Sequence, residues 1–222
     1  MADQALVVIC VHPGRDIQII FDTAAQFRLA YFDFSGTGYT SVEYPFQTGW
    51  SIRTHGKGEV LAALADQHLT DFDYLAIIDD DVGLRISDIN RLLLLGRSHR
   101  LDLFQPSLSA DSYISHPHLR HRPNHEMVET SFVEAMMPFF SYLTFERCRD
   151  LFAQSQSGWG IDIVWSDRIC RARGRLGVIH AVVATHLRPV RSHTWIMPNG
   201  LTPPEEMRAL IRRHGIGKYA VR

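Results

Sequence analysis

The stretch YLAIIDDDVGL, residues 74–84, contains the pattern that decides the fold. A run of apolar side chains leads directly into three consecutive aspartates, Asp79, Asp80 and Asp81. A short apolar run with polar residues at its end is typical of a strand buried on both faces of a sheet. Adjacent carboxylates repel one another, and next to a buried strand they are costly unless a cation lies among them. The sequence therefore predicts a buried strand that ends at a cation-binding cluster of carboxylates.

Strands and helices alternate around this stretch over the first 100 residues. The apolar runs ALVVICV and RLAYFDF predict strands over 5–11 and 28–34, and a shorter strand is predicted over 40–46. Apolar residues at helical spacing predict helices over 59–68 and 86–96, and a short helix is predicted over 16–25. This alternation predicts an α/β fold with a mostly parallel central sheet flanked by helices.

The rest of the chain is less regular. We predict strands over 103–108, 132–142 and 176–184, the second broken by Pro138, and helices over 144–154, after 160 and over 203–214. We expect a single domain over 1–222, with a nucleotide-binding half (1–100), an acceptor-side half (101–200) and a C-terminal helix (201–222).

The composition limits the classes of partner. A formal net charge of −1 gives no reason to expect binding to nucleic acid. Apolar runs all fall well short of the ~18 residues of a membrane span, and the start MADQ has no basic region typical of a signal peptide. The three cysteines are widely spaced and odd in number, as expected for reduced thiols. We expect a cytoplasmic protein.

The aspartates lie where ligands collect in open α/β sheets, at the carboxyl end of a strand. In an extended chain Asp79 and Asp81 point the same way and Asp80 points the opposite way. Two converging carboxylates suit Mg²⁺ or Mn²⁺, which readily bridge to a diphosphate. Alternatively, the aspartates form a turn and cap the next helix, which explains one of them but not three. Upstream, Lys57 stands between two glycines before a predicted helix, where it can approach a phosphate or a nucleobase.

The segment HGKGEVLAALADQHLTDFDYLAIIDDDVGL, residues 55–84, resembles the GT-A nucleotide-sugar glycosyltransferases, in which a G-K segment and a helix precede a strand that ends in a D-x-D motif. Further pieces resemble the domain-of-unknown-function 707 family of plants and bacteria. These pieces are DYLAIIDDDVG (73–83), FQPSLS (104–109), SFVEAMMPFFS (131–141), GWGIDI (158–163) and GVIHAVVATH (177–186).

The resemblance implies a single GT-A-like (Rossmann-like) domain. It also implies a metal-dependent glycosyltransferase that moves a sugar from a nucleoside-diphosphate sugar, expected to be UDP-linked, to a hydroxyl of a glycan, lipid or small molecule. On the donor side it implies that Asp79 contacts the nucleotide and shares in the metal site, with Lys57 and Asp80 also at the donor. It further implies that Asp81 holds Mn²⁺ or Mg²⁺ together with a late histidine, His186, with His180 as the rival.

On the acceptor side, the resemblance places Asp162 where many inverting enzymes keep the catalytic base. The N-terminus of a helix is expected to lower its pKa, although Asp162 would also serve as a simple helix cap. Trp159 is a candidate platform for a sugar ring or a core residue. Glu134 lies in an apolar stretch, so it needs a partner or faces the cleft, where it would bind acceptor hydroxyls.

Residues 109–126 are polar, contain Pro and are rich in His, and we expect a long surface loop. His116, His118, His121 and His125 suggest zinc, but the missing Cys and the intervening Pro and Arg favour a mobile lid with Arg120 and Arg122 available to a diphosphate. Three other functions stay open: a phosphatase of the haloacid-dehalogenase type, a sugar nucleotidyltransferase, and a non-catalytic nucleotide-sugar binding protein.

Overall fold

The computed structural model describes residues 5–39, 44–67, 69–190 and 192–217. The strands are β1 (Ala5–Val11), β2 (Ile19–Ile20), β3 (Arg28–Asp33), β4 (Thr48–Ser51), β5 (Tyr74–Ile78), β6 (Val82–Arg85), β7 (Leu103–Leu108), β8 (Met127–Glu129), β9 (Phe139–Ser141) and β10 (Leu176–His186). The helices are α1 (Lys57–Ala65), α2 (Ile86–Ser98), α3 (Tyr142–Phe152), α4 (Ile161–Arg171) and α5 (Pro203–Arg213), with short 3-10 turns at Pro117–Leu119 and Ser192–Thr194.

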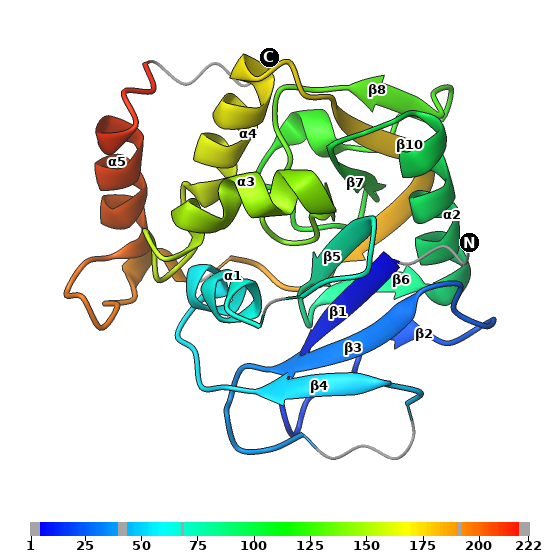
Figure 1. The fold of residues 1–222 in the computed structure, drawn as a ribbon, viewed down its shortest axis with the longest axis horizontal. Coiled ribbons are helices and arrows are strands. Elements are labelled where there is room, and N and C mark those ends of the chain that lie inside the picture. The colour runs from blue at the N-terminus through cyan, green and yellow to red at the C-terminus, as the bar shows by residue number, and fades with distance from the viewer. Residues whose placement is uncertain (1–4, 40–43, 68, 191, 218–222) are drawn as a thin grey trace.

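The strands form a central sheet in the order β2-β6-β10-β7-β9-β5-β1-β3-β4, and β8 pairs with β10 beside it (Figure 1). The strands β5, β1, β3 and β4 run parallel to one another. The short β9 runs antiparallel between β5 and β7, and β7 is again parallel to β10. This mixed but mostly parallel α/β sheet flanked by helices confirms the predicted fold class.

Apolar side chains on both faces of the sheet hold the helices in place. In β1, Val7 and Ile9 pack in the core that includes the buried side of α2, whereas Leu6 and Val8 pack in the core that includes α1, α3 and α4. All four side chains are almost completely buried. Because successive side chains of a strand point to opposite faces, a strand covered on both sides must be apolar throughout. This is why ALVVICV and YLAII are continuous apolar runs.

Several local predictions differ from the structure. The helix predicted over 16–25 is absent, and this segment contributes only the short β2. The strand predicted over 40–46 falls partly on residues 40–43, which lie outside the described residues, and the edge strand is β4 instead. Of 132–142 only β9 is a strand, although the carbonyl oxygens of Pro138 and Met136 still accept the backbone N–H groups of Ile77 and Asp79. Pro138 lacks a backbone N–H and interrupts the ladder. Within the described residues, every helix is too short or too polar to cross a membrane.

Candidate functional site

The three aspartates form a turn between β5 and β6, at the carboxyl ends of the parallel strands β5 and β1. We call residues 79–81 the acidic turn. It forms part of the wall of a cavity of about 1440 Å³. The lining comes from the ends of β1, β3 and β5, from α1, and from the segments 134–136, 157–163, 186–190 and 192–197. A cavity at this edge of the sheet is where an α/β fold is expected to bind its ligand.

Lys57 is the cation that faces Asp79. Its ammonium Nζ lies 2.5 Å from Asp79 Oδ1 and 3.2 Å from the carbonyl oxygen of Ile77. Burial raises the pKa of Asp79 to about 6, even with this ammonium beside it. Burial lowers the pKa of Lys57, but Asp79, Cys10 and Asp81 together raise it by more, so Lys57 is charged at pH 7. The carboxylate of Asp79 is therefore already paired with a side chain of the protein itself.

The glycines around Lys57 serve the packing of α1. Gly56 and Gly58 lie directly against the backbone of the loop 155–157, and a Cβ on Gly56 would meet the carbonyl oxygen of Gln156 at 2.6 Å. A Cβ on Gly58 would overlap the carbonyl oxygen of Ser155. The sequence suggested that these glycines let a ligand approach. In the structure they let the loop approach, and this contact fixes the start of α1 and hence Lys57.

Two arginines neutralise the rest of the acidic turn. Arg188 donates from Nε to Asp81 Oδ2 at 3.1 Å and from Nη2 to Asp80 Oδ1 at 2.5 Å. Arg15 donates from Nη1 to Asp80 Oδ2 at 2.8 Å. The expectation that Asp80 points away from its neighbours is wrong, because the strand ends at Ile78 and the alternation of an extended chain does not continue into the turn. The cations that lie among the three carboxylates are thus Lys57, Arg15 and Arg188.

His186 ends β10 next to the acidic turn. Its Nδ1 donates to the carbonyl oxygen of Tyr113 at 2.7 Å, and its Nε2 lies 3.5 Å from Asp81 Oδ2. Burial lowers the pKa of His186, but Asp81 and the Tyr113 carbonyl raise it by more. Burial raises the pKa of Asp81, and His186 and Arg188 lower it by more. His180 points elsewhere, since its Nδ1 accepts a hydrogen bond from the backbone N–H of Arg122.

These positions test whether Mn²⁺ or Mg²⁺ would fit. Within the described ranges, no three His, Cys, Asp or Glu side chains come together as a metal-binding group. Asp81 and His186 do fit, because the hydrogen bond from Nδ1 leaves the lone pair of Nε2 directed toward Asp81, as in histidine ligands of metals. Mg²⁺ commonly takes only one or two protein ligands and completes its shell with phosphates and water. Asp79, which we expected to share in the site, is held by Lys57 instead.

Two further carboxyl groups line the cavity. Asp162 lies in the first turn of α4, and its Oδ1 accepts the backbone N–H of Ile163 at 2.9 Å. Burial raises the pKa of Asp162 to about 6, so the expectation that the helix N-terminus lowers it is wrong: desolvation outweighs the backbone N–H groups. Glu134 Oε2 is buried with no hydrogen-bond partner among the described residues. Burial, followed by the charge of Asp162, raises the pKa of Glu134 to about 7.

Hydrogen bonds to the C-terminal helix α5 hold the loop that carries Trp159. Trp159 is half-buried and lines the cavity, which leaves its ring accessible to a ligand. Glu206 of α5 accepts hydrogen bonds from the backbone N–H groups of Gln156 and Ser157 at 3.0 and 2.8 Å and from Ser155 Oγ at 3.1 Å. Burial raises the pKa of Glu206, but these hydrogen bonds lower it by more, so this carboxylate is ionised.

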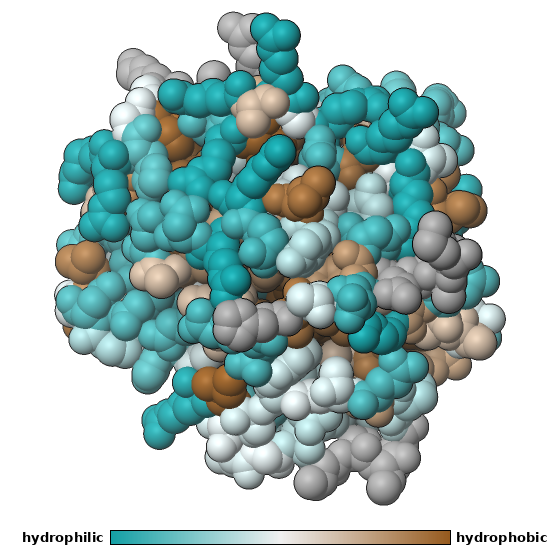
Figure 2. All heavy atoms as spheres, in the orientation of Figure 1, coloured by the Kyte–Doolittle hydropathy of each residue, from teal (hydrophilic) through white to brown (hydrophobic). Residues whose placement is uncertain are grey.

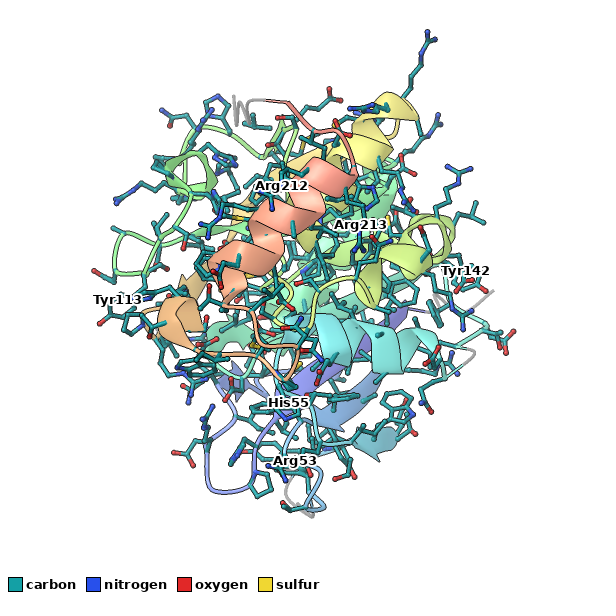
Figure 3. All side chains as sticks on the ribbon, turned by 90° about the vertical axis from the view of Figure 1, so that its left-hand side faces the viewer. Arg53, His55, Tyr113, Tyr142, Arg212 and Arg213 are labelled. Carbon is teal, nitrogen blue, oxygen red and sulfur yellow. The ribbon has the colours of Figure 1, made fainter. Side chains whose placement is uncertain are left out.

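Several residues of the site were missed by sequence reasoning. Arg15, Arg53, His55, Arg188 and Trp195 all line the cavity. Figure 3 shows Arg53 and His55 one after the other on the segment that leads into α1. Arg188 follows His186 by two residues, and this spacing is the one signal that could have identified it. Arg15 and Arg53 carry no such signal, because they reach the cavity only through the packing of distant loops.

The histidine-rich stretch 116–125, which we call the histidine segment, is tied to the body of the protein. Leu119 is fully buried, and the rings of His116 and His118 pack on Phe132. His121 Nδ1 lies 3.1 Å from Ser107 Oγ. The residues that line the cavity include His116 but neither Arg120 nor Arg122, so the predicted lid that offers these arginines to a diphosphate is not supported.

Comparison with known proteins supports the fold. No protein-family model matches the chain, and no curated protein matches its sequence. The likeness to the domain-of-unknown-function 707 family therefore stays a resemblance of motifs.

Among solved structures, S. aureus TarS 1–349 in complex with UDP-GlcNAc is similar, with 10% identity, a TM-score of 0.64, and coverage of 96% of this chain and 66% of that one. TarS 1–349 in complex with UDP gives 11% identity, a TM-score of 0.63, and coverage of 96% and 64%. The chain thus spans about two thirds of the TarS structures, and the likeness establishes a GT-A-like fold.

Proposed function

We propose that this protein is a metal-dependent glycosyltransferase that moves a sugar from a nucleoside-diphosphate sugar, UDP-linked, to a hydroxyl acceptor. The observation that carries this proposal is that one cavity gathers the acidic turn, Lys57, His186, Glu134 and Asp162. These side chains come from distant parts of the chain, and a structural role alone does not explain why so many ionisable groups share one cavity. That TarS, with the same fold, is found in complex with UDP and UDP-GlcNAc supports the choice of nucleotide.

On the donor side, the diphosphate would lie between the acidic turn and the cations of the cavity. Asp81 and His186 would hold Mn²⁺ or Mg²⁺, which would neutralise the diphosphate and stabilise it as a leaving group. Lys57, which pairs with Asp79, would fix that carboxylate beside the nucleotide, and the two arginines that pair with Asp80 would be available to phosphate oxygens. Trp159 offers an aromatic face to a sugar ring.

On the acceptor side, Asp162 would accept the proton of the attacking hydroxyl. The acceptor oxygen forms a bond to the anomeric carbon, the bond between that carbon and the diphosphate oxygen breaks, and the nucleoside diphosphate leaves with the electron pair. With a pKa of about 6, Asp162 is mostly ionised at pH 7 and basic enough to take the proton. Glu134, whose Oε2 is buried without a partner, would hydrogen-bond the acceptor.

Binding of nucleotide sugars tests this function directly. We expect UDP-sugars with Mn²⁺ to raise the melting temperature of the protein, because a ligand that binds only the folded state stabilises it. EDTA should abolish the shift. The absence of a shift with UDP-, GDP- and other nucleotide sugars would contradict the proposal.

Binding without transfer would leave the second candidate. If a UDP-sugar binds tightly but no glycan, lipid or small-molecule acceptor supports release of UDP, the protein is a nucleotide-sugar sensor on a glycosyltransferase fold. The carboxyl pair Glu134 and Asp162 argues for the enzyme, because a sensor does not need two ionisable groups with raised pKa values beside the donor.

A further inference from the structure

Arg188 bridges the carboxylates of the acidic turn that a donor would need. Its Nε and Nη2 reach Asp81 Oδ2 and Asp80 Oδ1, and Asp81 Oδ2 is the same oxygen that lies 3.5 Å from His186 Nε2. One oxygen is thus shared by the guanidinium and by the histidine that is suited to a metal. A guanidinium and a divalent cation cannot both occupy that position, since both are positive and approach the same lone pairs.

The position of Arg188 allows it to move away. It lies two residues beyond the end of β10, just after Leu187, whose backbone N–H donates to the carbonyl oxygen of Asp81, and its side chain is 40% exposed. It also lines the cavity, so the space in front of it is the space a ligand enters. An arginine fork binds phosphate oxygens as well as it binds carboxylates.

We infer that Arg188 is a diphosphate-binding residue that exchanges the acidic turn for the diphosphate when donor and metal bind together. This inference rests on the proposed function. Without ligand, Arg188 neutralises Asp80 and Asp81. With both ligands, it releases these carboxylates and pairs with the phosphate oxygens.

The exchange makes the two ligands bind cooperatively. Metal alone must displace the Nε of Arg188 from Asp81 without offering it a new partner, and the diphosphate alone can attract Arg188 only by exposing bare carboxylates to its own negative charge. When both bind, the cost of separating Arg188 from the acidic turn is incurred once and is offset by the new pair. The coupling is reciprocal, so each ligand raises the affinity of the other by the same factor.

Isothermal titration of the full chain with Mn²⁺ alone, and with UDP in the presence of Mn²⁺, tests the exchange. In Arg188→Ala, Mn²⁺ alone should bind about three- to tenfold more tightly, because its competitor is gone. In the same variant UDP with Mn²⁺ should bind about tenfold or more weakly, because a charge-assisted pair is lost. These opposite signs are the expected result. A rise in both affinities would make Arg188 a simple counter-ion, and an unchanged affinity for Mn²⁺ alone would mean that it does not compete; either outcome overturns the inference.

Three controls separate this inference from the proposed function on which it rests. Arg53→Ala removes another arginine of the cavity that has no ion pair with the acidic turn among the described residues, and it should leave the affinity for Mn²⁺ alone unchanged. Arg188→Lys keeps the charge without the fork and should give intermediate affinities. Uridine lacks the diphosphate, so its affinity should be the same in wild type and Arg188→Ala. If wild type binds neither UDP nor UDP-sugars with Mn²⁺, the proposed function fails, whereas an altered affinity for Mn²⁺ alone would still reveal the competition.

Discussion

The acidic turn and the histidine segment both carry a concentration of metal-ligating side chains, yet only His116 of the histidine segment is among the residues that line the cavity beside the acidic turn. The acidic turn lies at the carboxyl ends of parallel strands, faces a cavity, and has Lys57, Arg15 and Arg188 as its counter-ions. The histidine segment is held against the body of the protein by the buried side chain of Leu119 and by a hydrogen bond from the backbone N–H of Arg122 to His180. Figure 2 shows the face of Figure 1, on which single apolar side chains are scattered among hydrophilic ones.

The contrast teaches that ligand chemistry depends on the partners and the space around a cluster more than on its residue types. Burial, followed by the charge of Arg122 and the neighbouring His121 and His125, lowers the pKa of His180 to about 4, so this histidine is neutral over the physiological range. Its Nδ1 is already an acceptor within the protein. In the acidic turn, by contrast, Asp81 and His186 keep an oxygen and a nitrogen facing the cavity.

The largest effect is expected at Asp162. Asp162→Asn keeps the shape of the side chain but cannot accept a proton, so the rate of sugar transfer should fall by about 10²–10⁴. The affinity for UDP with Mn²⁺ should change little, because the carboxylate faces the acceptor. The rate of UDP release measures sugar transfer, and titration calorimetry measures the affinity for UDP with Mn²⁺. His125→Ala, in the histidine segment, is the matched control and should keep full activity. Equal losses in both variants would remove the distinction between the two regions.

The affinity for Mn²⁺ gives the next largest effect. Asp81→Asn and His186→Ala should each weaken Mn²⁺ binding in the presence of UDP by about 10- to 100-fold, because each removes one of the two side chains suited to the ion. His180→Asn is the control in the same strand, and it should bind Mn²⁺ like wild type. Electron paramagnetic resonance of free Mn²⁺ gives the affinities. If His180→Asn loses the ion and His186→Ala keeps it, the metal assignment at the end of β10 is wrong.

The buried carboxyl of Glu134, in the cavity beside the acidic turn, should make the stability of the protein depend on pH. The folded-state pKa of about 7 is above its ordinary value of 4.5, so the folded protein holds this proton more tightly than the unfolded chain. Stability is therefore lost as pH rises from 4.5 through 7. Glu134→Gln, which is neutral at every pH, should melt higher than wild type at pH 8 by about 2–4 °C for each kcal/mol recovered. At pH 5 the two proteins should melt alike. A variant that is less stable at both pH values would mean that the carboxylate has a partner.

The sequence predicted the parts of the molecule that depend on local pattern. Continuous apolar runs identified β1, β3 and β5, since a strand covered by helices on both faces has no polar positions. The need of the three aspartates for a cation was also predicted, because the cost of adjacent carboxylates is a local property. The side chains that supply these cations were not predicted: Lys57 stands in a recognisable motif but was expected to approach a phosphate or a nucleobase, and Arg15 and Arg188 are 65 and 108 residues from Asp80. The pKa of Asp162 was mispredicted because its burial depends on the 134–136 and 157–163 segments meeting in space.

The smallest effect is expected in the histidine segment itself. Ser107 Oγ lies 3.1 Å from the carbonyl oxygen of Val182, to which it donates, so it accepts from His121 Nδ1. Removing the imidazole in His121→Ala leaves the Ser107 hydroxyl with its own acceptor, and no buried donor loses its partner. The loss should therefore be that of one hydrogen bond, about 0.5–1.5 kcal/mol. Urea unfolding of His121→Ala, Ser107→Ala and the double variant measures the coupling between the two side chains. Affinities for Mn²⁺ and UDP should be unchanged in His121→Ala, because His121 lies outside the residues that line the cavity. A loss of Mn²⁺ binding in this variant would place ligand chemistry in the histidine segment, and the two regions would no longer differ in function.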